Sequence, residues 1–402
     1  MSDFYQNGII TTLHRLGKPS LQRLEAELVE FSKIRPVALV LPSLYSEFEG
    51  LAMPRIVEEL SKVKYIKEII LVLDKASEKE FQKVKEFMSP ISYEVKIIHN
   101  DGKRIGEIYD TFERNGLEVG QRGKGRSAWM AYGYVIARGQ SDVIALHDCD
   151  IVTYNREMLA RLCYPVVNPN IDYVFCKGYY SRITDRMHGR VTRLLITPLI
   201  RSIQTLQGTL GFISFLNSFR YPLSGEFCMI TDVARVNRIP WDWGLEVGSL
   251  AEVYRNYSPR RVCQVDIAEN YDHKHQVLSE NDPEKGLLKM TIDICKSIFR
   301  NLASEGSVFS EGFFKSLSVA YLRQAEDTIL RYEADAAING LEFDRHEEAK
   351  AVEAFTRGII LAAQAFMENP MGTPLIPNWN RVISAIPGIL DMLKKAVDED
   401  NH

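Results

Sequence analysis

Short apolar runs alternate with amphipathic segments through the first 150 residues of the chain. Runs rich in Val, Ile and Leu predict buried strands at residues 37–41, 68–74, 93–98 and 142–146. Apolar positions spaced three and four residues apart predict helices at residues 51–63, 77–87 and 127–138. Strands that are apolar along their whole length and alternate with helices are typical of a mainly parallel sheet with helices on both faces.

The last third of the chain has a different pattern, with long segments of helical period. Two more strands are predicted before it, at residues 172–178 and 261–267. After a boundary near residue 282, helices are predicted at residues 286–302, 313–338, 347–367 and 381–397. We therefore expect a helical N-terminal segment over residues 1–35, an α/β domain over 36–282, and a helical extension over 283–402 that serves packing or dimerisation.

Composition narrows the class of protein without identifying a function. The 402 residues include 49 Lys and Arg against 53 Asp and Glu, with no dominant basic cluster, which argues against binding to nucleic acid. The six cysteines form no CxxC pair, a usage typical of reduced thiols in the cytoplasm. The first residues lack the pattern of a signal peptide, and no apolar stretch reaches the ~20 residues of a membrane span. We therefore expect a cytoplasmic protein that does not bind a membrane.

Asp148-Cys149-Asp150 directly follows the fourth predicted strand. Two carboxylates one residue apart can present oxygens to Mg²⁺ or Mn²⁺, and such an ion can bridge the phosphates of a bound nucleotide. An Asp-x-Asp tripeptide by itself is more often a solvated turn. Its place at the carboxyl end of a buried strand, where parallel sheets bind ligands, favours the metal site, and Pro42 and Asp74 lie at two further strand ends.

Two segments have the residue types that bind anions. Gly123-Lys124-Gly125 precedes a predicted helix, whose first amides and the lysine could receive a phosphate, although a solvated loop is an equal alternative. Gly189-Arg190-Val191-Thr192 offers amides, a guanidinium and a hydroxyl for a phosphate or carboxylate. A solvated basic face is the competing interpretation for this second segment, because it lies among Arg182, Arg186, Arg193 and Arg201.

Histidines and glutamates further along the chain could complete such a site. The imidazole of His273 could join Asp150 in binding a metal ion, and His275 could donate to an anionic acceptor. Taken singly, each histidine is more typical of a surface residue. Glu226 and Glu246 each lie beside a glycine and could accept hydrogen bonds from sugar hydroxyls, or else cap a helix or form a surface turn.

In their order and spacing, these segments resemble the glucosyl-3-phosphoglycerate synthases. The resemblance covers roughly residues 36–280 and ends with the strand that leads to His273. Its motifs are Pro42-Ser43-Leu44, Val72-Leu73-Asp74, Gly123-Lys124-Gly125, Asp148-Cys149-Asp150, Lys177-Gly178-Tyr179-Tyr180, Gly189-Arg190-Val191-Thr192, Pro222-Leu223-Ser224-Gly225-Glu226 and Gly244-Leu245-Glu246-Val247-Gly248. The resemblance implies a GT-A, Rossmann-like α/β fold and a retaining enzyme. Such an enzyme would move glucose from UDP-glucose or GDP-glucose to the 2-hydroxyl of D-3-phosphoglycerate.

The resemblance also implies a role for individual residues. For the nucleotide-sugar donor, the implied residues are Pro42, Ser43, Leu44, Glu47, Asp74, Lys124 and Asp148. The implied ligands of Mg²⁺ or Mn²⁺ are Asp150 and His273, and the residues implied at the reaction centre are Glu246 and Asp148. For the phosphate and carboxylate of the acceptor, they are Gly189, Arg190, Thr192 and His275.

The chain departs from the family pattern at two places in this set. The segment after the first strand reads Pro-Ser-Leu-Tyr-Ser-Glu where Pro-Ala-Leu-Asn-Glu is usual, and His275 stands where family members carry Asn. Two alternatives keep the fold: mannosyl transfer from GDP-mannose, or unphosphorylated glycerate as the acceptor. A more distant alternative is a nucleotide-sugar-binding module without turnover. We expect a nucleotide-sugar donor and a small phosphorylated acceptor as ligands, and a homodimer as the assembly.

Overall fold

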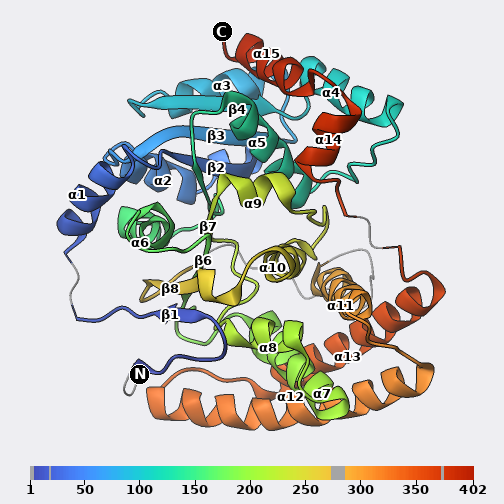
Figure 1. Ribbon diagram of the computed structural model, residues 1–402. Coiled ribbons are helices and arrows are strands. Elements are labelled where there is room, and N and C mark those ends of the chain that lie inside the picture. Colours follow the sequence, from blue (N-terminus) through green and yellow to red (C-terminus); the bar gives the residue numbers. More distant parts are fainter. Residues whose placement is uncertain (1–3, 18–19, 273–285, 373–374) are drawn as a thin grey trace.

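The computed structural model describes residues 4–17, 20–272, 286–372 and 375–402 of the chain. An eight-stranded sheet crosses the molecule in the order β1-β8-β6-β7-β5-β2-β3-β4 (Figure 1). Its strands are β1 (Thr11–Leu13), β2 (Val37–Leu44), β3 (Ile66–Asp74), β4 (Glu94–His99), β5 (Val143–Leu146), β6 (Phe175–Tyr180), β7 (Phe227–Ile230) and β8 (Val262–Ala268). Every pairing is parallel except those of β7, which runs antiparallel to β5 and β6.

Helices cover both faces of the sheet and extend beyond one side of it. In the α/β part they are α1 (Leu21–Phe31), α2 (Ala52–Leu60), α3 (Glu78–Met88), α4 (Lys103–Arg114), α5 (Lys124–Arg138), α6 (Arg156–Val167), α7 (Thr197–Gln207), α8 (Gly211–Ser218), α9 (Thr231–Val236) and α10 (Leu245–Asn256). The C-terminal part has α11 (Gly286–Ser304), α12 (Glu311–Asn339), α13 (Arg345–Glu368), α14 (Trp379–Ala385) and α15 (Ile389–Asn401). Within the described ranges, no helix combines the length and the apolarity needed to cross a membrane.

The central strands are buried on both faces, which explains their continuous apolar sequence. Along β2, Ala38 and Val40 belong to one hydrophobic core, whereas Val37, Leu39 and Leu41 belong to the other. Side chains alternate between the two faces of a strand, so a strand between two helical layers needs apolar residues at every position. The prediction of a mainly parallel sheet covered on both faces is confirmed.

The topology creates a crevice at one point along the carboxyl edge of the sheet. The chain passes outward from β2 to β3 and β4, and then returns to place β5 on the other side of β2. Loops after β2 and β5 therefore lead away in opposite directions. Parallel sheets bind ligands at such a switch point.

Some predicted element boundaries are wrong. Strand β2 continues through Pro42 to Leu44, because residues 42–44 pair with β3 and not with the shorter β5. The N-terminal segment that was predicted to be helical also contains β1, which pairs with β8. Helix α4 was not predicted, and the helix predicted over residues 381–397 is two helices that meet near Gly388, whose φ is 82°.

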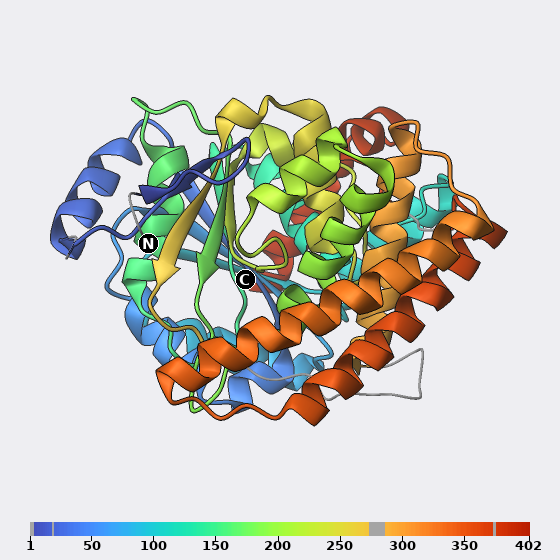
Figure 2. The same ribbon diagram turned by 90° about the horizontal axis from the view of Figure 1, so that it is seen from below.

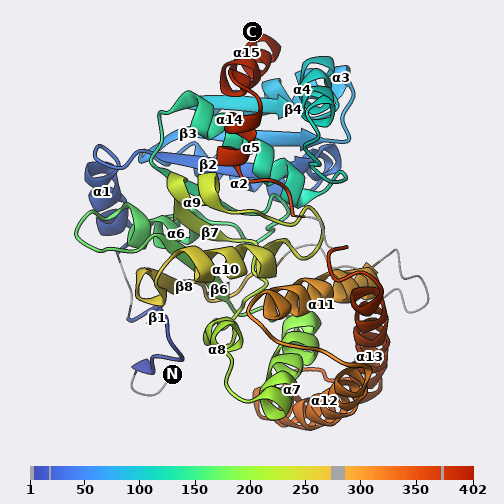
Figure 3. The same ribbon diagram turned by 45° about the vertical axis from the view of Figure 1, so that its right-hand side comes forward.

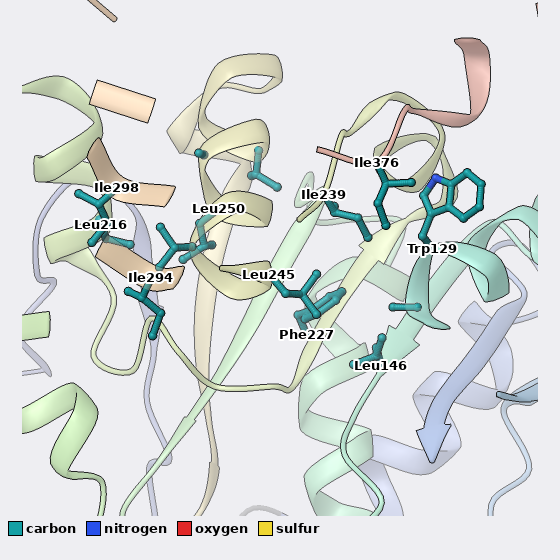
Figure 4. Packing of buried hydrophobic residues seen from close by; sticks show 14 of the residues in the cluster. Trp129, Leu146, Leu216, Phe227, Ile239, Leu245, Leu250, Ile294, Ile298 and Ile376 are labelled. Atoms are coloured by element: carbon teal, nitrogen blue, oxygen red, sulfur yellow. The ribbon is translucent and has the colours of Figure 1, made fainter. Parts of the chain in front are cut away.

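The C-terminal helices lie against two different parts of the α/β structure. Helix α12 packs along α7, and α11 packs between α10 and α13. The chain then returns to the opposite end of the sheet, where α15 covers β4 and α5 (Figure 3). The predicted boundary near residue 282 falls outside the described residues. Close by, α11 carries Ile294 and Ile298 into the same hydrophobic cluster as Leu216 and Leu250 (Figure 4).

A pair of tryptophans joins the returning segment to α5. The rings of Trp129 and Trp379 stack with their centroids 4.5 Å apart. The indole N–H of Trp379 donates to the carbonyl of Trp129 over 2.9 Å, and that of Trp129 donates to the carbonyl of Pro377 over 2.8 Å. Gly133 leaves room for the Trp379 ring, since a Cβ there would lie 1.9 Å from it. The two indole N–H groups are thus satisfied inside the core, as buried donors require.

We expect Trp379→Ala to lower the free energy of unfolding by about 3–5 kcal/mol, because it removes a fully buried ring and leaves a cavity. Urea-induced unfolding followed by circular dichroism measures this change. Val308, which is 88% exposed, supplies the control. Val308→Ala is expected to change the same quantity by less than about 0.5 kcal/mol. Equal effects of the two substitutions would contradict the proposed attachment of the C-terminal segment.

Candidate active site

A cavity of about 900 Å³ lies at the carboxyl edge of the sheet, where the switch point falls. Every described residue to which the family resemblance gives a role lines it: Pro42, Ser43, Leu44, Glu47, Asp74, Lys124, Asp148, Asp150, Gly189, Arg190, Thr192 and Glu246. His273 and His275 lie outside the described residues, so their predicted roles stay predictions. The shared cavity arises because β2, β3 and β5 are parallel neighbours whose carboxyl ends open on one side.

Lys124 occupies the centre of the charged groups in the cavity. Its Nζ lies 2.5 Å from Asp148 Oδ1 and 3.4 Å from Glu246 Oε1. Burial by itself would lower the pKa of this ammonium, but the charges of Asp148 and Glu246 outweigh burial and raise the pKa above its ordinary value. Lys124 therefore stays charged at neutral pH and holds the two carboxylates together across the cavity.

The glycines beside Lys124 allow a distant segment of the chain to pack closely. A Cβ on Gly125 would lie 2.1 Å from the carbonyl oxygen of Pro240, and a Cβ on Gly123 would lie 2.6 Å from that of Trp241. The glycines thus allow the 240–241 segment to pack against the first turn of α5. This packing places Trp241 in the cavity wall.

Asp150 has the environment of a group that is stabilised by a cation. Burial, together with the charges of Asp148 and Glu47, raises the pKa of its carboxyl to about 7. A divalent cation beside Asp150 would offset this repulsion, and carboxylate oxygens are the donors that Mg²⁺ and Mn²⁺ prefer. Among the described residues, no group of three or more His, Cys, Asp or Glu side chains is arranged to hold a metal ion. The predicted partner of Asp150, His273, lies outside those residues.

Asp74 is held firmly at the end of β3. Its Oδ1 accepts a hydrogen bond from Asn100 Nδ2 over 3.0 Å, and its Oδ2 accepts one from the hydroxyl of Ser127. Arg122 Nε lies 3.7 Å from Asp74 Oδ1. The carboxylate of Asp74 is therefore ordered by α5 and by the turn after β4. Its side chain is buried at the wall of the cavity.

Glu226 lies beneath the cavity instead of lining it. Its two carboxylate oxygens accept hydrogen bonds from the hydroxyls of Tyr180 over 2.7 Å and Tyr271 over 2.5 Å. The two tyrosine rings stack with centroids 3.7 Å apart. Burial raises the pKa of Glu226 above its ordinary value. The hypothesis of a surface turn is therefore wrong for Glu226, and the alternative of direct contact with a sugar hydroxyl has no support from its position.

Lys177 is a second buried cation, to which sequence reasoning gave no role. Its Nζ donates to the carbonyl of Ser224 over 2.8 Å, and burial lowers its pKa to about 8. This bond supports the 221–225 loop from below. That loop places Gly225 against the ion pair, where a Cβ would lie 2.5 Å from Asp148 Oδ2 and 2.7 Å from Lys124 Nζ.

The segment around Arg190 is not a solvated basic face. Arg193, which the competing interpretation placed on the surface, is buried and donates to Glu348 of α13 and to the carbonyls of Met187 and His188. Arg190 also contacts Glu348, with Nε 2.7 Å from Oε1. In both contacts the two residues are more than 150 positions apart in sequence, so no local pattern could reveal them. Arg201 is exposed, in agreement with the alternative expectation for it.

Helix α11 contributes residues to the cavity that sequence reasoning missed, because this region was expected to serve packing or dimerisation. They are Leu287, Lys289, Met290, Asp293 and Ile294. Burial, together with the charge of Asp242, raises the pKa of Asp293 to about 7. A wall of the cavity therefore belongs to the C-terminal helices.

Comparisons with known proteins identify the family. A glucosyl-3-phosphoglycerate synthase of Persephonella marina is 51% identical over 401 residues, which is 100% of this chain and 99% of the relative. One of Methanococcoides burtonii is 38% identical over 406 residues, which is 99% of this chain and 98% of the relative. The chain belongs to the glucosyl-3-phosphoglycerate synthase family. No family model matches it.

Solved structures of glucosyl-3-phosphoglycerate synthase share the fold. The Mycobacterium tuberculosis enzyme in complex with Mg²⁺ and UDP has a TM-score of 0.54 at 19% identity and covers 76% of this chain and 89% of its own. A mannosyl-3-phosphoglycerate synthase of Rubrobacter xylanophilus has a TM-score of 0.54 at 20% identity and covers 71% of this chain and 80% of its own. The predicted fold and the predicted class, a glycosyltransferase of this family, are confirmed. Both full-length sequence alignments include the C-terminal helices, whereas the structural alignments leave about a quarter of this chain unmatched.

We expect Gly225→Ala to reduce glucosyl transfer by about 100-fold without unfolding the protein. The new methyl group would push Asp148 and Lys124 apart, and a displacement of about 1 Å in a reacting group costs on the order of 10²-fold in rate. Steady-state kinetics and a thermal melt measure the two effects. Gly106→Ala in α4, where a Cβ would meet nothing within 4 Å, is the control and should leave the rate unchanged. Full activity of Gly225→Ala would contradict a tightly packed ion pair.

Proposed function

We propose that this enzyme transfers glucose from UDP-glucose to the 2-hydroxyl of D-3-phosphoglycerate, with retention of configuration and with Mg²⁺ or Mn²⁺ as the cofactor. The observation that carries the proposal is the meeting of Lys124, Asp148, Asp150, Glu246 and Arg190 at one cavity of a family member. Structures of the Mycobacterium tuberculosis enzyme with Mn²⁺, UDP-glucose and phosphoglyceric acid support it, because they share this fold.

The donor is proposed to lie along the carboxyl ends of β2, β3 and β5. Pro42, Ser43 and Leu44 offer a partly apolar surface and backbone groups to the base and ribose, with Glu47 one turn further on. Asp74 is ordered by Asn100 and Ser127 on the same side. This set is proposed to orient the nucleoside so that its diphosphate points towards Asp150.

Asp150, with His273 as its predicted partner, is proposed to hold the divalent cation. The ion, when bound, neutralises the negative charge that develops on the departing diphosphate. The carboxylate oxygens of Asp148 and Glu246 both lie beside Lys124 and can accept hydrogen bonds from the hydroxyls of the glucose. A fixed sugar exposes one face to the acceptor, so the acceptor hydroxyl can attack on the face from which the diphosphate leaves. The proton of that hydroxyl passes to a phosphate oxygen of the departing diphosphate. No protein nucleophile is then required.

The acceptor is proposed to bind against Gly189, Arg190 and Thr192, with His275 as a further predicted contact. A guanidinium matches the geometry of a phosphate with two parallel N–H donors. Arg190 reaches this position from the start of a π-helical segment, Val191–Ile196. π-Helical turns of this kind occur frequently at functional sites.

The proposal is tested by measuring UDP release with UDP-glucose, D-3-phosphoglycerate and Mg²⁺ or Mn²⁺, with GDP-mannose and glycerate as the competing donor and acceptor. We expect turnover with the first pair and its loss on addition of EDTA. Arg190→Ala should raise KM for 3-phosphoglycerate about 10- to 100-fold, since a charge-assisted contact is worth about 1.5–3 kcal/mol, and should leave glycerate unaffected. Arg201→Ala, at an exposed arginine outside the cavity, is the control. Faster turnover with GDP-mannose or with glycerate would contradict the proposed substrates.

We also propose a homodimer and a cytoplasmic location. Exposed apolar side chains on α12, namely Val319, Leu330 and Ile338, support an association between chains. The six cysteines, all buried and unlinked, support a reducing compartment. Light scattering should give about twice the chain mass of 45.9 kDa, and Leu330→Glu should reduce that value. A particle of one chain mass at micromolar concentration would contradict the dimer.

A further inference from the structure

The C-terminal helices hold the segment that carries Arg190. The backbone N–H of Glu342, in the connection between α12 and α13, donates to the carbonyl of Asp185 over 2.8 Å. Arg186 forms an ion pair with Glu342, with Nη2 and Oε2 2.6 Å apart. Figure 2 shows α12 and α13 as two long helices that lie side by side. The loop that leads to Arg190 is therefore attached to the end of one long helix and the start of the next.

Glu348, in the first turn of α13, joins the two arginines of this segment. Its Oε1 accepts from Arg190 Nε over 2.7 Å, and its Oε2 accepts from Arg193 Nη1 over 3.0 Å. The side chain of Glu348 is 6% exposed, whereas that of Arg190 is 33% exposed. Glu348 is not part of the cavity lining, but Arg190 is. One buried carboxylate thus links a buried cation to a cation at the cavity.

Arg193 fixes the position of Glu348. Its Nε donates to the carbonyl of His188 over 3.0 Å, and its Nη2 donates to that of Met187 over 3.2 Å. Its guanidinium also lies over the ring of Tyr332, 4.8 Å from the centroid. A guanidinium that is held on all sides cannot follow a movement of the carboxylate. The second oxygen of Glu348, Oε1, is therefore held in a fixed position, where it accepts from Arg190.

This arrangement leaves a defined part of Arg190 for a ligand. A guanidinium has five N–H donors in one plane, on Nε and on the two terminal nitrogens. Glu348 takes the donor on Nε. The edge formed by the two terminal nitrogens can still bind two oxygens of a phosphate in parallel. The contact with Glu348 fixes the plane of the guanidinium, and hence the direction of that edge.

We propose that Glu348 is a positioning residue for the acceptor: it orients Arg190 towards the phosphate without touching the substrate. This inference rests on the proposed role of Arg190 in binding 3-phosphoglycerate. A purely electrostatic role would have the opposite effect. Glu348 carries a negative charge beside Arg190, so its removal would leave more positive charge and would strengthen the binding of an anion. Positioning predicts weaker binding after the same change.

The test compares Glu348→Gln with the wild-type enzyme in the UDP-release assay. Glu348→Gln keeps the volume of the side chain and removes its charge. We expect KM for 3-phosphoglycerate to rise about tenfold, the equivalent of one contact to a charged group, with KM for UDP-glucose and turnover of glycerate unchanged. In an Arg190→Ala background the same substitution should add no further change, because residues that act through one another are not additive. Glu353→Gln, at an exposed position of the same helix, is the control and should leave KM unchanged.

An unchanged or lower KM for 3-phosphoglycerate in Glu348→Gln would overturn the inference, as would an equal rise in the Arg190→Ala background. Glu348→Asp, which keeps the charge but shortens the reach, should give an intermediate KM and supplies a second variant if Glu348→Gln melts below the assay temperature. If the wild-type enzyme releases no UDP with 3-phosphoglycerate, the proposed function fails. If the wild type is active and the Glu348 variants behave like it, only the positioning role fails.

Discussion

The ion pair between Lys124 and Asp148 is the interaction on which the arrangement of the cavity depends. Lys124 opens α5, and Asp148 follows β5, so the pair joins the two elements on either side of the switch point. A Cβ on Gly225 would displace this ion pair, which is why a glycine stands there. Lys177 supports the loop that carries Gly225 by donating to the carbonyl of Ser224. A local change at any of these places therefore alters the distance between the carboxylates that face the ligand.

The same turn of α5 connects the cavity to the C-terminal end of the chain. Gly123 and Gly125 allow the 240–241 segment to pack closely against the helix. Directly before that segment, Ile239 accepts a backbone hydrogen bond from Ile376, and the two side chains lie beside Trp129 (Figure 4). Trp129 in turn stacks on Trp379. A continuous series of packed residues thus connects Lys124 and its carboxylate partners to the C-terminal segment that carries Trp379.

Charges in this protein are balanced locally and not by an overall field. The net charge is −4, although the ligands proposed for the cavity are anions. Three buried or half-buried cations at the site have a carboxylate or carbonyl partner: Lys124 has Asp148, Arg193 has Glu348, and Lys177 has the carbonyl of Ser224. Paired charges of this kind lose less free energy on burial than isolated ones. Each pairing also fixes the orientation of the donor group, which a general excess of positive charge would not do.

The amino-acid sequence by itself determined the mainly parallel sheet and the residues that gather at its carboxyl edge. Strands buried on both faces need apolar residues at every position, and the polar residues that follow them must then meet at one edge. The partners of Arg190 and Arg193, the wall supplied by α11 and the packing role of Gly123 and Gly125 were decided by the tertiary structure. Glu348 lies in the first turn of α13, and its spacing from Val352 and Phe355 places it on the apolar face of that helix, but no local pattern names its partners. Its burial against two arginines depends on how α12 and α13 dock, and contacts between residues more than 150 positions apart leave no periodic signal in the chain.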